Sequence, residues 1–271
     1  MTLKFIESLQ KRRIRQEAGC FFLEGLRAVT EAAGSGASIL KLVASESFLY
    51  SSQWKQMRSI YSSVYHKDAE LILLRVGDKS FARLADTVTP QGIGAVIEMP
   101  WRKLQGPEAV LDLSVENGRF GILILENLQD PGNMGTIIRT ADAVGFRGVL
   151  CSKGTVDLYN SKVLRSAVGS LFRLPVLQTE LSATEIAVRL QQRGYCTAAA
   201  HPRGGIDLFA ADFTDKTALC IGNEAGGLSE ELLMACTQRV TIPMPGGTES
   251  LNASVAAALM MYEVRRKGQY K

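Results

Sequence analysis

The chain has 271 residues, of which 46% are hydrophobic and 21% are charged, a balance that is typical of folded globular proteins and excludes a disordered one. No apolar run approaches the roughly 18–20 residues that a membrane-spanning helix needs. The N-terminal segment carries Glu7, Glu17 and Glu24 and has the pattern of neither a signal peptide nor a transit peptide. A cytoplasmic protein is therefore expected.

Charge is distributed unevenly along the chain. The net charge is +4, yet residues 1–103 hold 15 Lys and Arg against 10 Asp and Glu, whereas residues 104–271 hold 16 against 17. The N-terminal excess is concentrated at four positions, Lys11, Arg12, Arg13 and Arg15. Such a cluster is either a solvated helix face or an electrostatic footprint for nucleic acid, and both interpretations stay open.

The first hundred residues predict a small α/β domain. Residues 3–9 have helical apolar spacing, and the apolar run 20–23 predicts a short strand that ends before a helix over 26–33. Further short units that could pair in a sheet cover 39–44, 69–74 and 92–98. We place this domain at residues 1–100.

A polar stretch punctuated by Pro and Gly, residues 101–118, is the expected linker. After it, apolar strands of the buried kind alternate with helices. The predicted strands cover 121–126, 148–152, 195–200, 217–222 and 240–243, and the predicted helices cover 134–144, 160–168, 183–193, 229–235 and 254–266. This alternation indicates an α/β domain over residues 119–271, with a mostly parallel sheet covered on both faces.

Three of the predicted strands end in unusual loops. Residues 128–135 read LQDPGNMG and open a helix that bears Arg139. Residues 222–229 read GNEAGGLS, and residues 242–256 read IPMPGGTESLNASVA. Ligands bind at the carboxyl ends of the strands in parallel α/β sheets, and glycines let the backbone approach a ligand closely. The three loops therefore predict one binding pocket.

Several common sites are not supported. GxGxxG and GxxxxGK[ST] are missing, which argues against a Rossmann dinucleotide site and a P-loop. Two histidines and no GxSxG motif do not favour a Ser-His-Asp hydrolase. The five cysteines form no CxxC pair, so no metal site is expected. His201 is open to two interpretations, a catalytic base or part of a loop that borders the pocket.

Together, the three loops resemble in order and spacing the motifs of the SpoU (TrmH-type) branch of the SPOUT methyltransferases. The first motif is the stretch 130–139, DPGNMGTIIR, and the others are 221–229 and 242–256. The resemblance covers about residues 119–267. A shorter similarity, over residues 12–25, is to the ribosomal-protein-like RNA-binding domain that is often fused to these enzymes.

The resemblance implies a knotted α/β fold and a homodimer. It also implies S-adenosylmethionine (AdoMet) bound in a bent form at the knot, and methyl transfer to an RNA ribose 2′-hydroxyl. By motif position, the expected cofactor contacts are Gly222, Ile242 and Leu251. The residues expected on the catalytic side are Asn133, Arg139, Glu224, Ser250 and Asn252. RNA becomes the expected partner of the N-terminal basic cluster. The fused domain favours ribosomal RNA; a transfer-RNA methyltransferase and an inactive RNA-binding relative are the alternatives.

A role for Arg139 follows from its chemistry. Proposals for the family make this arginine the general base, but deprotonating an ordinary guanidinium near pH 7 costs about 9 kcal/mol. We therefore expect a cationic Arg139 that binds the phosphate beside the target ribose and stabilises the developing alkoxide, with phosphate or water as the final proton acceptor. Simpler alternatives are helix capping for Asn133, Ser250 and Asn252, a surface ion pair for Arg139 and a solvated loop carboxylate for Glu224.

Overall fold

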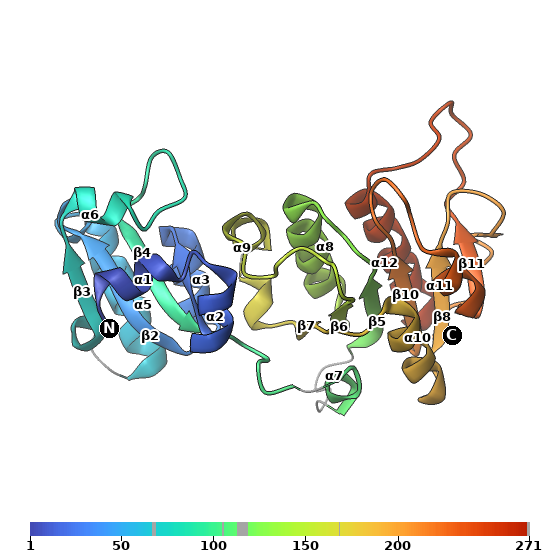
Figure 1. Cartoon of the computed structure of the whole chain (residues 1–271), viewed down its shortest axis with the longest axis horizontal. Helices are drawn as coiled ribbons and strands as arrows, with labels where there is room; N and C mark the ends of the chain where they lie inside the picture. Colours follow the sequence, from blue (N-terminus) through green and yellow to red (C-terminus); the bar gives the residue numbers. More distant parts are fainter. Residues whose placement is uncertain (67–68, 105, 113–118, 168, 270–271) are drawn as a thin grey trace. The chain divides into compact units, whose positions relative to one another are not determined.

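The chain forms two compact units (Figure 1). The computed structural model describes residues 1–66, 69–104, 106–112, 119–167 and 169–269. Unit 1 consists of Met1–Arg102 and Tyr159–Arg173, and unit 2 consists of Lys103–Leu158 and Leu174–Lys271. Residues 105 and 113–118 of the predicted linker lie outside the described residues.

The sheet of unit 1 has four strands in the order β1-β4-β2-β3. The strands are β1 (Cys20–Glu24), β2 (Ile39–Ser45), β3 (Leu73–Val76) and β4 (Ile93–Glu98). β4 pairs antiparallel with both β1 and β2, and β3 runs parallel to β2. All residues of β4 except Glu98 are buried, because helices cover both faces of this central strand.

The helices of unit 1 pack on the two faces of its sheet. On one face lie α3 and α5, and on the other lie α1 and α6; the buried residues on this second face include Ile6, Leu9 and Phe81. The helices of residues 1–102 are α1 (Leu3–Ser8), α2 (Arg12–Ala18), α3 (Leu26–Gly34), α4 (Glu46–Leu49), α5 (Ser52–Tyr65) and α6 (Asp78–Ala82). Unit 1 is thus a layered α/β unit, as the sequence predicts.

Two details of this unit differ from the sequence-based expectation. Residues 69–74 do not form one sheet unit: a 3-10 turn, η1 (Ala69–Ile72), precedes β3. Helix α5 was not predicted, because serines dilute its apolar pattern. It begins after Ser51, whose hydroxyl accepts a hydrogen bond from the Trp54 amide (3.3 Å) and acts as an N-cap.

A segment that the sequence places in the C-terminal domain packs within unit 1. It contains α9 (Ser161–Ala167) and η2 (Ser170–Phe172). The Phe21 ring lies 4.8 Å from that of Tyr159 and 6.5 Å from that of Phe172. Trp101 Nε1 donates to the Leu171 carbonyl oxygen (2.9 Å). The two packing units therefore differ from the predicted domains 1–100 and 119–271 by this segment, and those boundaries stay a prediction.

The sheet of unit 2 has seven strands in the order β7-β6-β5-β10-β8-β11-β9. They are β5 (Phe120–Leu125), β6 (Phe146–Cys151), β7 (Val176–Gln178), β8 (Cys196–Ala200), β9 (Ile206–Asp207), β10 (Thr217–Ile221) and β11 (Gln238–Thr241). All neighbours pair in parallel, which confirms the predicted sheet. The edge strands β7 and β9 were not predicted, because they are too short to show a pattern.

Helices also cover both faces of this second sheet. α8 and α12 pack against each other on one face, and α7, α10 and α11 share a core cluster with the strands on the other. The helices are α7 (Glu108–Asp112), α8 (Pro131–Val144), α10 (Ala183–Gln192), α11 (Glu230–Ala235) and α12 (Ala253–Gln269). All of β5 and β10 is buried, as expected for central strands of a covered parallel sheet.

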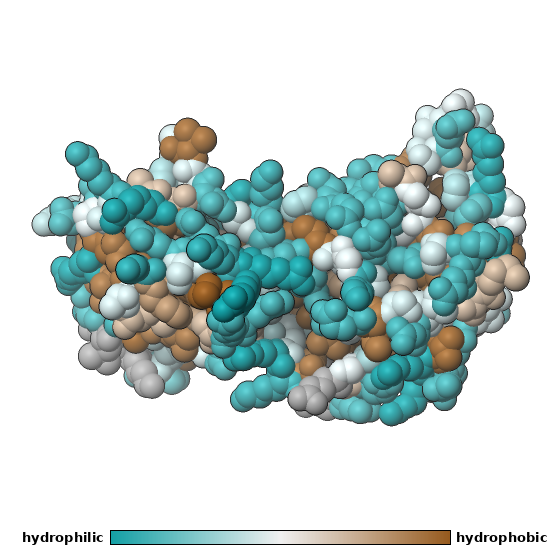
Figure 2. Space-filling view, in the orientation of Figure 1, coloured by the Kyte–Doolittle hydropathy of each residue, from teal (hydrophilic) through white to brown (hydrophobic). Residues whose placement is uncertain are grey.

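Hydrophilic residues dominate the visible surface of each unit in Figure 2. Within the part of the chain that the structure describes, no helix is both long enough and apolar enough to cross a membrane.

Candidate functional site

Three loops at the carboxyl ends of parallel strands build the site. They follow β5, β10 and β11 and contain the three sequence motifs. β5 and β10 are direct neighbours, and just beyond them the Glu126 amide donates to the Ile221 carbonyl oxygen (2.9 Å). The sheet order therefore brings motifs that lie far apart in the sequence to one edge, where parallel α/β sheets bind ligands.

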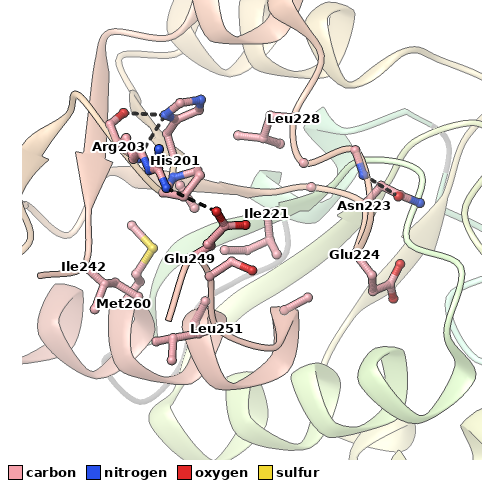
Figure 3. A pocket seen from close by; sticks show the side chains of 18 of the residues that line it. His201, Arg203, Ile221, Asn223, Glu224, Leu228, Ile242, Glu249, Leu251 and Met260 are labelled. Atoms are coloured by element: carbon pink, nitrogen blue, oxygen red, sulfur yellow. Dashed lines mark hydrogen bonds and ion pairs between the residues drawn. The ribbon is translucent and has the colours of Figure 1, made fainter. Parts of the chain in front are cut away.

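A cavity of about 480 Å³ lies beside these loops (Figure 3). Its walls come from the segment after β8, the loops after β10 and β11, and α12. Five of the predicted site residues line it: Gly222, Glu224, Ile242, Ser250 and Leu251. Leu228 and Met260 add apolar side chains to the wall (Figure 3). The cavity wall therefore combines apolar side chains with polar groups, as small-molecule sites do.

Close packing requires a glycine at position 222. A Cβ atom there would lie 2.2 Å from the Gly227 carbonyl carbon and 2.5 Å from the Leu228 amide nitrogen. Asn223 and Gly227 close the turn through two backbone hydrogen bonds of 2.9 Å each. The side-chain oxygen of Asn223 accepts from two further amides of the turn (2.9 and 3.0 Å). The cavity wall here is therefore a rigid turn that presents backbone.

Three polar side chains, one from each motif, form a chain of hydrogen bonds. Asn133 Nδ2 donates to Glu224 Oε1 (3.0 Å), and Asn252 Nδ2 donates to Asn133 Oδ1 (3.0 Å). Asn133 is only 8% exposed, so breaking either bond would leave a buried amide group unpaired. This polar chain fixes the orientation of both amides and ties the loops after β5, β10 and β11 together.

Glu224 anchors the polar chain. Its carboxylate also accepts from the backbone amides of Gln129 (3.2 Å) and Asp130 (3.0 Å). Partial burial raises the pKa of Glu224, but the hydrogen bonds from Asn133 and from backbone amides outweigh burial, so the pKa lies below its ordinary value of 4.5. Glu224 is therefore ionised at neutral pH and is a weak proton acceptor there.

The helix caps agree with the sequence at one helix and differ at the other. At α8 the N-cap is Asp130, whose carboxylate accepts from the Asn133 backbone amide (2.7 Å). The capping interpretation of Asn133 is therefore wrong, because this residue is the third of the helix and its side chain joins the polar chain. Asn252 does cap α12: its Oδ1 accepts from the amides of Ser254 (2.9 Å) and Val255 (3.4 Å).

Arg139 and Ser250 lie outside the polar chain. Arg139 is on the exposed face of α8, and Ser250 is on the exposed loop before α12. Neither side chain makes a hydrogen bond or an ion pair with another described residue. Ser250 lines the cavity, whereas Arg139 is not among the residues that do. The structure thus brings Ser250, but not Arg139, to the cavity wall.

One of the four N-terminal basic residues is not at the surface. Arg15 is 7% exposed, and its Nη1 donates to the carbonyl oxygens of Leu9 and Gln10 (2.7 Å each). These carbonyls follow α1, so Arg15 stabilises the turn into α2, and its assignment as an RNA contact is corrected. The other three are exposed: Lys11, Arg12 and Arg13.

The loop after β8 contributes residues that the sequence did not single out. Arg203 from this loop lines the cavity, as does Glu249 from the loop before α12. His201 also lines it and turns back toward the backbone of Arg203 (Figure 3), which favours the border interpretation over the catalytic base. β8 lies between β10 and β11, so this loop is at the edge where the carboxyl-end rule places a ligand, but no sequence signal singled out Arg203 within it.

The structure shows no metal cluster in its described part. No group of three or more His, Cys, Asp or Glu side chains there is placed to hold a metal ion. The Cys220 and Cys236 sulfurs lie 3.7 Å apart, and both thiols are free.

The fold and the site define a class: an α/β protein with a ligand cavity at the carboxyl ends of parallel strands, built on three loops tied together by polar side chains. Comparison with known proteins identifies the family. Residues 121–262 match the SpoU rRNA methylase family, and residues 1–95 match the MRM3-like substrate binding domain. The chain belongs to the SpoU rRNA methylase family.

Two relatives of similar length are named as methyltransferases of 23S ribosomal RNA. The 23S rRNA (guanosine(2553)-2′-O)-methyltransferase RlmP of Bacillus subtilis (strain 168) is 30% identical over 259 residues, which is 96% of this chain and 94% of RlmP. The 23S rRNA (uridine(2479)-2′-O)-methyltransferase of Streptomyces viridochromogenes is 33% identical over 273 residues, which is 96% of this chain and 87% of that protein.

Solved structures agree over nearly the whole chain. The SpoU methyltransferase AviRb from Streptomyces viridochromogenes, in complex with the cofactor AdoMet, has a TM-score of 0.81 at 29% identity, covering 98% of this chain and 97% of AviRb. The AdoMet-bound rRNA methyltransferase from Sinorhizobium meliloti has a TM-score of 0.78 at 29% identity, covering 97% and 94%. The family resemblance and the α/β fold are thus confirmed, and the knot stays a prediction.

Proposed function

We propose that this protein transfers a methyl group from AdoMet to a ribose 2′-hydroxyl of ribosomal RNA. The observation that carries the proposal is the polar chain Glu224–Asn133–Asn252 beside the cavity, because it joins the three family motifs into one site. Similarity over almost the full length to two 23S rRNA 2′-O-methyltransferases supports both the ribose acceptor and the class of RNA.

The cavity suits AdoMet. The tight turn at Gly222 offers backbone groups that can pair with the polar edge of an adenine, and Ile242 and Leu251 offer aliphatic surface to its ring. These three residues therefore form the proposed cofactor contacts. When bound, AdoMet supplies a methyl group made electrophilic by a positively charged sulfur.

The polar chain acts by positioning. Each of its side chains already makes a hydrogen bond with at least one other member of the chain, and ionised Glu224 is a weak base at neutral pH. Its role is to hold the loops in place before RNA binds, since fixed geometry lowers a reaction barrier. The Ser250 hydroxyl is available at the cavity wall and donates a hydrogen bond to a ribose or phosphate oxygen.

Arg139 supplies positive charge from outside the cavity. Its exposed guanidinium, which no described side chain neutralises, binds the phosphate beside the target ribose through two N–H groups. As the 2′-oxygen attacks, this cation stabilises the negative charge that develops. The 2′-proton leaves to phosphate or to water.

RNA binding is shared with unit 1. The substrate-binding family match covers the region that carries the basic excess, and its exposed members can contact phosphates: Lys11, Arg12 and Arg13. A solvated face with no RNA role is the alternative. The ribosomal substrate class would also place the protein in the cytoplasm.

A homodimer through α12 fits the exposed face of that helix. Val255, Leu259 and Tyr262 follow one another at spacings of four and three residues, which places them on one face. Their exposures are 48%, 46% and 59%. Covering this apolar stripe with its own copy in a twofold dimer would remove it from water. A strictly monomeric mass in light scattering would contradict this assembly.

The test is a map of 2′-O-methyl marks across total RNA from cells with and without the gene. We expect a ribosomal RNA mark to disappear, and to return when purified protein and AdoMet are added to the unmodified RNA. Loss confined to transfer RNA would change the substrate class. If no mark were lost, a non-catalytic RNA-binding relative would become the better account.

A further inference from the structure

Two side chains of opposite charge meet at the rim of the cavity (Figure 3). Arg203 comes from the loop after β8 and Glu249 from the loop before α12, and Arg203 Nη2 lies 3.7 Å from Glu249 Oε1. The two side chains are 76% and 89% exposed, yet both residues line the cavity. The pair therefore borders both solvent and the ligand space.

Few other charges line the cavity. Among its described lining residues, Arg203 is the single Arg or Lys, and the carboxylates are Glu224 and Glu249. Glu224 already accepts three hydrogen bonds from the segment that opens α8. Among the described residues, the Glu249 side chain has its ion pair with Arg203 and no other partner. A ligand that carries both a carboxylate and an ammonium group therefore finds its partners in Arg203 and Glu249.

We infer that Arg203 and Glu249 bind the amino-acid end of AdoMet. The planar guanidinium of Arg203 donates two parallel N–H bonds to the α-carboxylate, a geometry that lysine cannot reproduce. The Glu249 carboxylate accepts from the α-ammonium group. The inference rests on the proposed function and adds recognition of the charged end of the cofactor, whereas Gly222, Ile242 and Leu251 contact the rest.

For the ligand to bind in this way, the ion pair between Arg203 and Glu249 must open, and its exposure makes this easy. Such pairs contribute little to stability because water screens them, so the two side chains separate easily when a ligand replaces each partner. The loop that carries Glu249 projects at the upper right in Figure 1, and Figure 2 shows mostly hydrophilic and neutral residues over it. The rim is therefore suited to a charged group.

Calorimetry with two nucleosides separates the amino-acid end from the rest of the cofactor. S-Adenosylhomocysteine carries this end, and 5′-methylthioadenosine lacks it. Arg203→Gln should weaken S-adenosylhomocysteine binding about tenfold, because a bidentate charge-assisted contact is lost. Binding of 5′-methylthioadenosine should change less than about twofold, because only an exposed ion pair is lost. Glu249→Gln should show the same selectivity.

A matched control is Arg193→Gln. Arg193 belongs to the same unit and forms an exposed ion pair with Asp112 (3.6 Å), but it does not line the cavity, so both affinities should stay at the wild-type value. Equal losses for both nucleosides in Arg203→Gln, or no loss for either, would overturn the inference. If wild-type protein bound neither AdoMet nor S-adenosylhomocysteine, the proposed function itself would fail.

Discussion

The side chains of the polar chain differ from those of Arg139 and Ser250 in whether their polar groups already have partners. In the polar chain, Asn133, Glu224 and Asn252 bind one another and backbone amides. Arg139 and Ser250 are exposed and bind no described side chain. The difference indicates two roles. The polar chain holds the loops in place before RNA binds, and Arg139 and Ser250 are available to contact the substrate.

Loss of the exposed cation should produce the largest effect. Arg139→Ala is expected to lower the single-turnover methylation rate by about 100-fold or more, because a contact that stabilises transition-state charge is lost. Affinity for S-adenosylhomocysteine should stay unchanged, since Arg139 does not line the cavity. Arg139→Lys keeps the charge but loses the bidentate geometry, so its methylation rate should lie between those of wild type and Arg139→Ala. A decrease below about threefold in Arg139→Ala would contradict the role.

A change in the tight turn at Gly222 should instead act on the stability of the fold and on cofactor binding. Gly222→Ala forces a Cβ to within 2.2 Å of Gly227, which we expect to cost about 1–3 kcal/mol of unfolding free energy and about tenfold in S-adenosylhomocysteine affinity. Gly226→Ala is the matched control, because its Cβ would meet no atom closer than 3.9 Å. Chemical denaturation and calorimetry measure both quantities. Equal behaviour of the two variants would show that the tight turn is not needed.

The basic cluster of unit 1 should affect RNA binding through its charge. Neutralising Lys11, Arg12 and Arg13 together to glutamine removes three exposed charges. The slope of log affinity against log salt should become shallower by about two, since each phosphate contact in single strands contributes roughly 0.7. Filter binding at several salt concentrations tests this. An unchanged slope would leave the cluster as a solvated helix face.

The smallest expected effect is a pH dependence from Glu224. Its pKa is lower in the folded protein than its ordinary value of 4.5, so ionised Glu224 stabilises the fold above that value, and this contribution disappears as pH falls through the folded pKa. The stability difference between wild type and Glu224→Gln should therefore be constant near neutral pH and shrink below about pH 4.5. Denaturant unfolding from pH 7 to pH 3 measures it. A difference independent of pH would argue against the ionised anchor.

The sequence predicted the helices, strands and sheet of the fold better than the side-chain contacts. Buried apolar strands and glycine-bearing loops have local patterns, so the parallel sheet and the meeting of three motifs could be expected. The sequence-based interpretation took Asn133 as the cap of its helix, and only the structure shows that Asp130 caps α8 while Asn133 turns to Glu224. Such a choice depends on a partner about 90 residues away in the chain.

Charged residues were the hardest to place. Arg15 looks like its neighbours in the sequence, but its guanidinium turns inward to two backbone carbonyls. Arg203 and Glu249 lie in separate loops, and no local signal marks them as a pair. The orientation of a long charged side chain depends on tertiary structure, which composition and spacing do not encode.

The proposed acceptor of the methyl group is a ribose 2′-hydroxyl. The most direct measurement compares the ribosomal RNA fragment that the protein methylates with a fragment that has a single 2′-deoxy nucleotide at the modified position. Both are incubated with the protein and AdoMet carrying a labelled methyl group. We predict that the deoxy fragment binds but takes up no label, because the nucleophilic oxygen is missing. Label on the deoxy fragment would contradict the claim and assign the methyl group to a base.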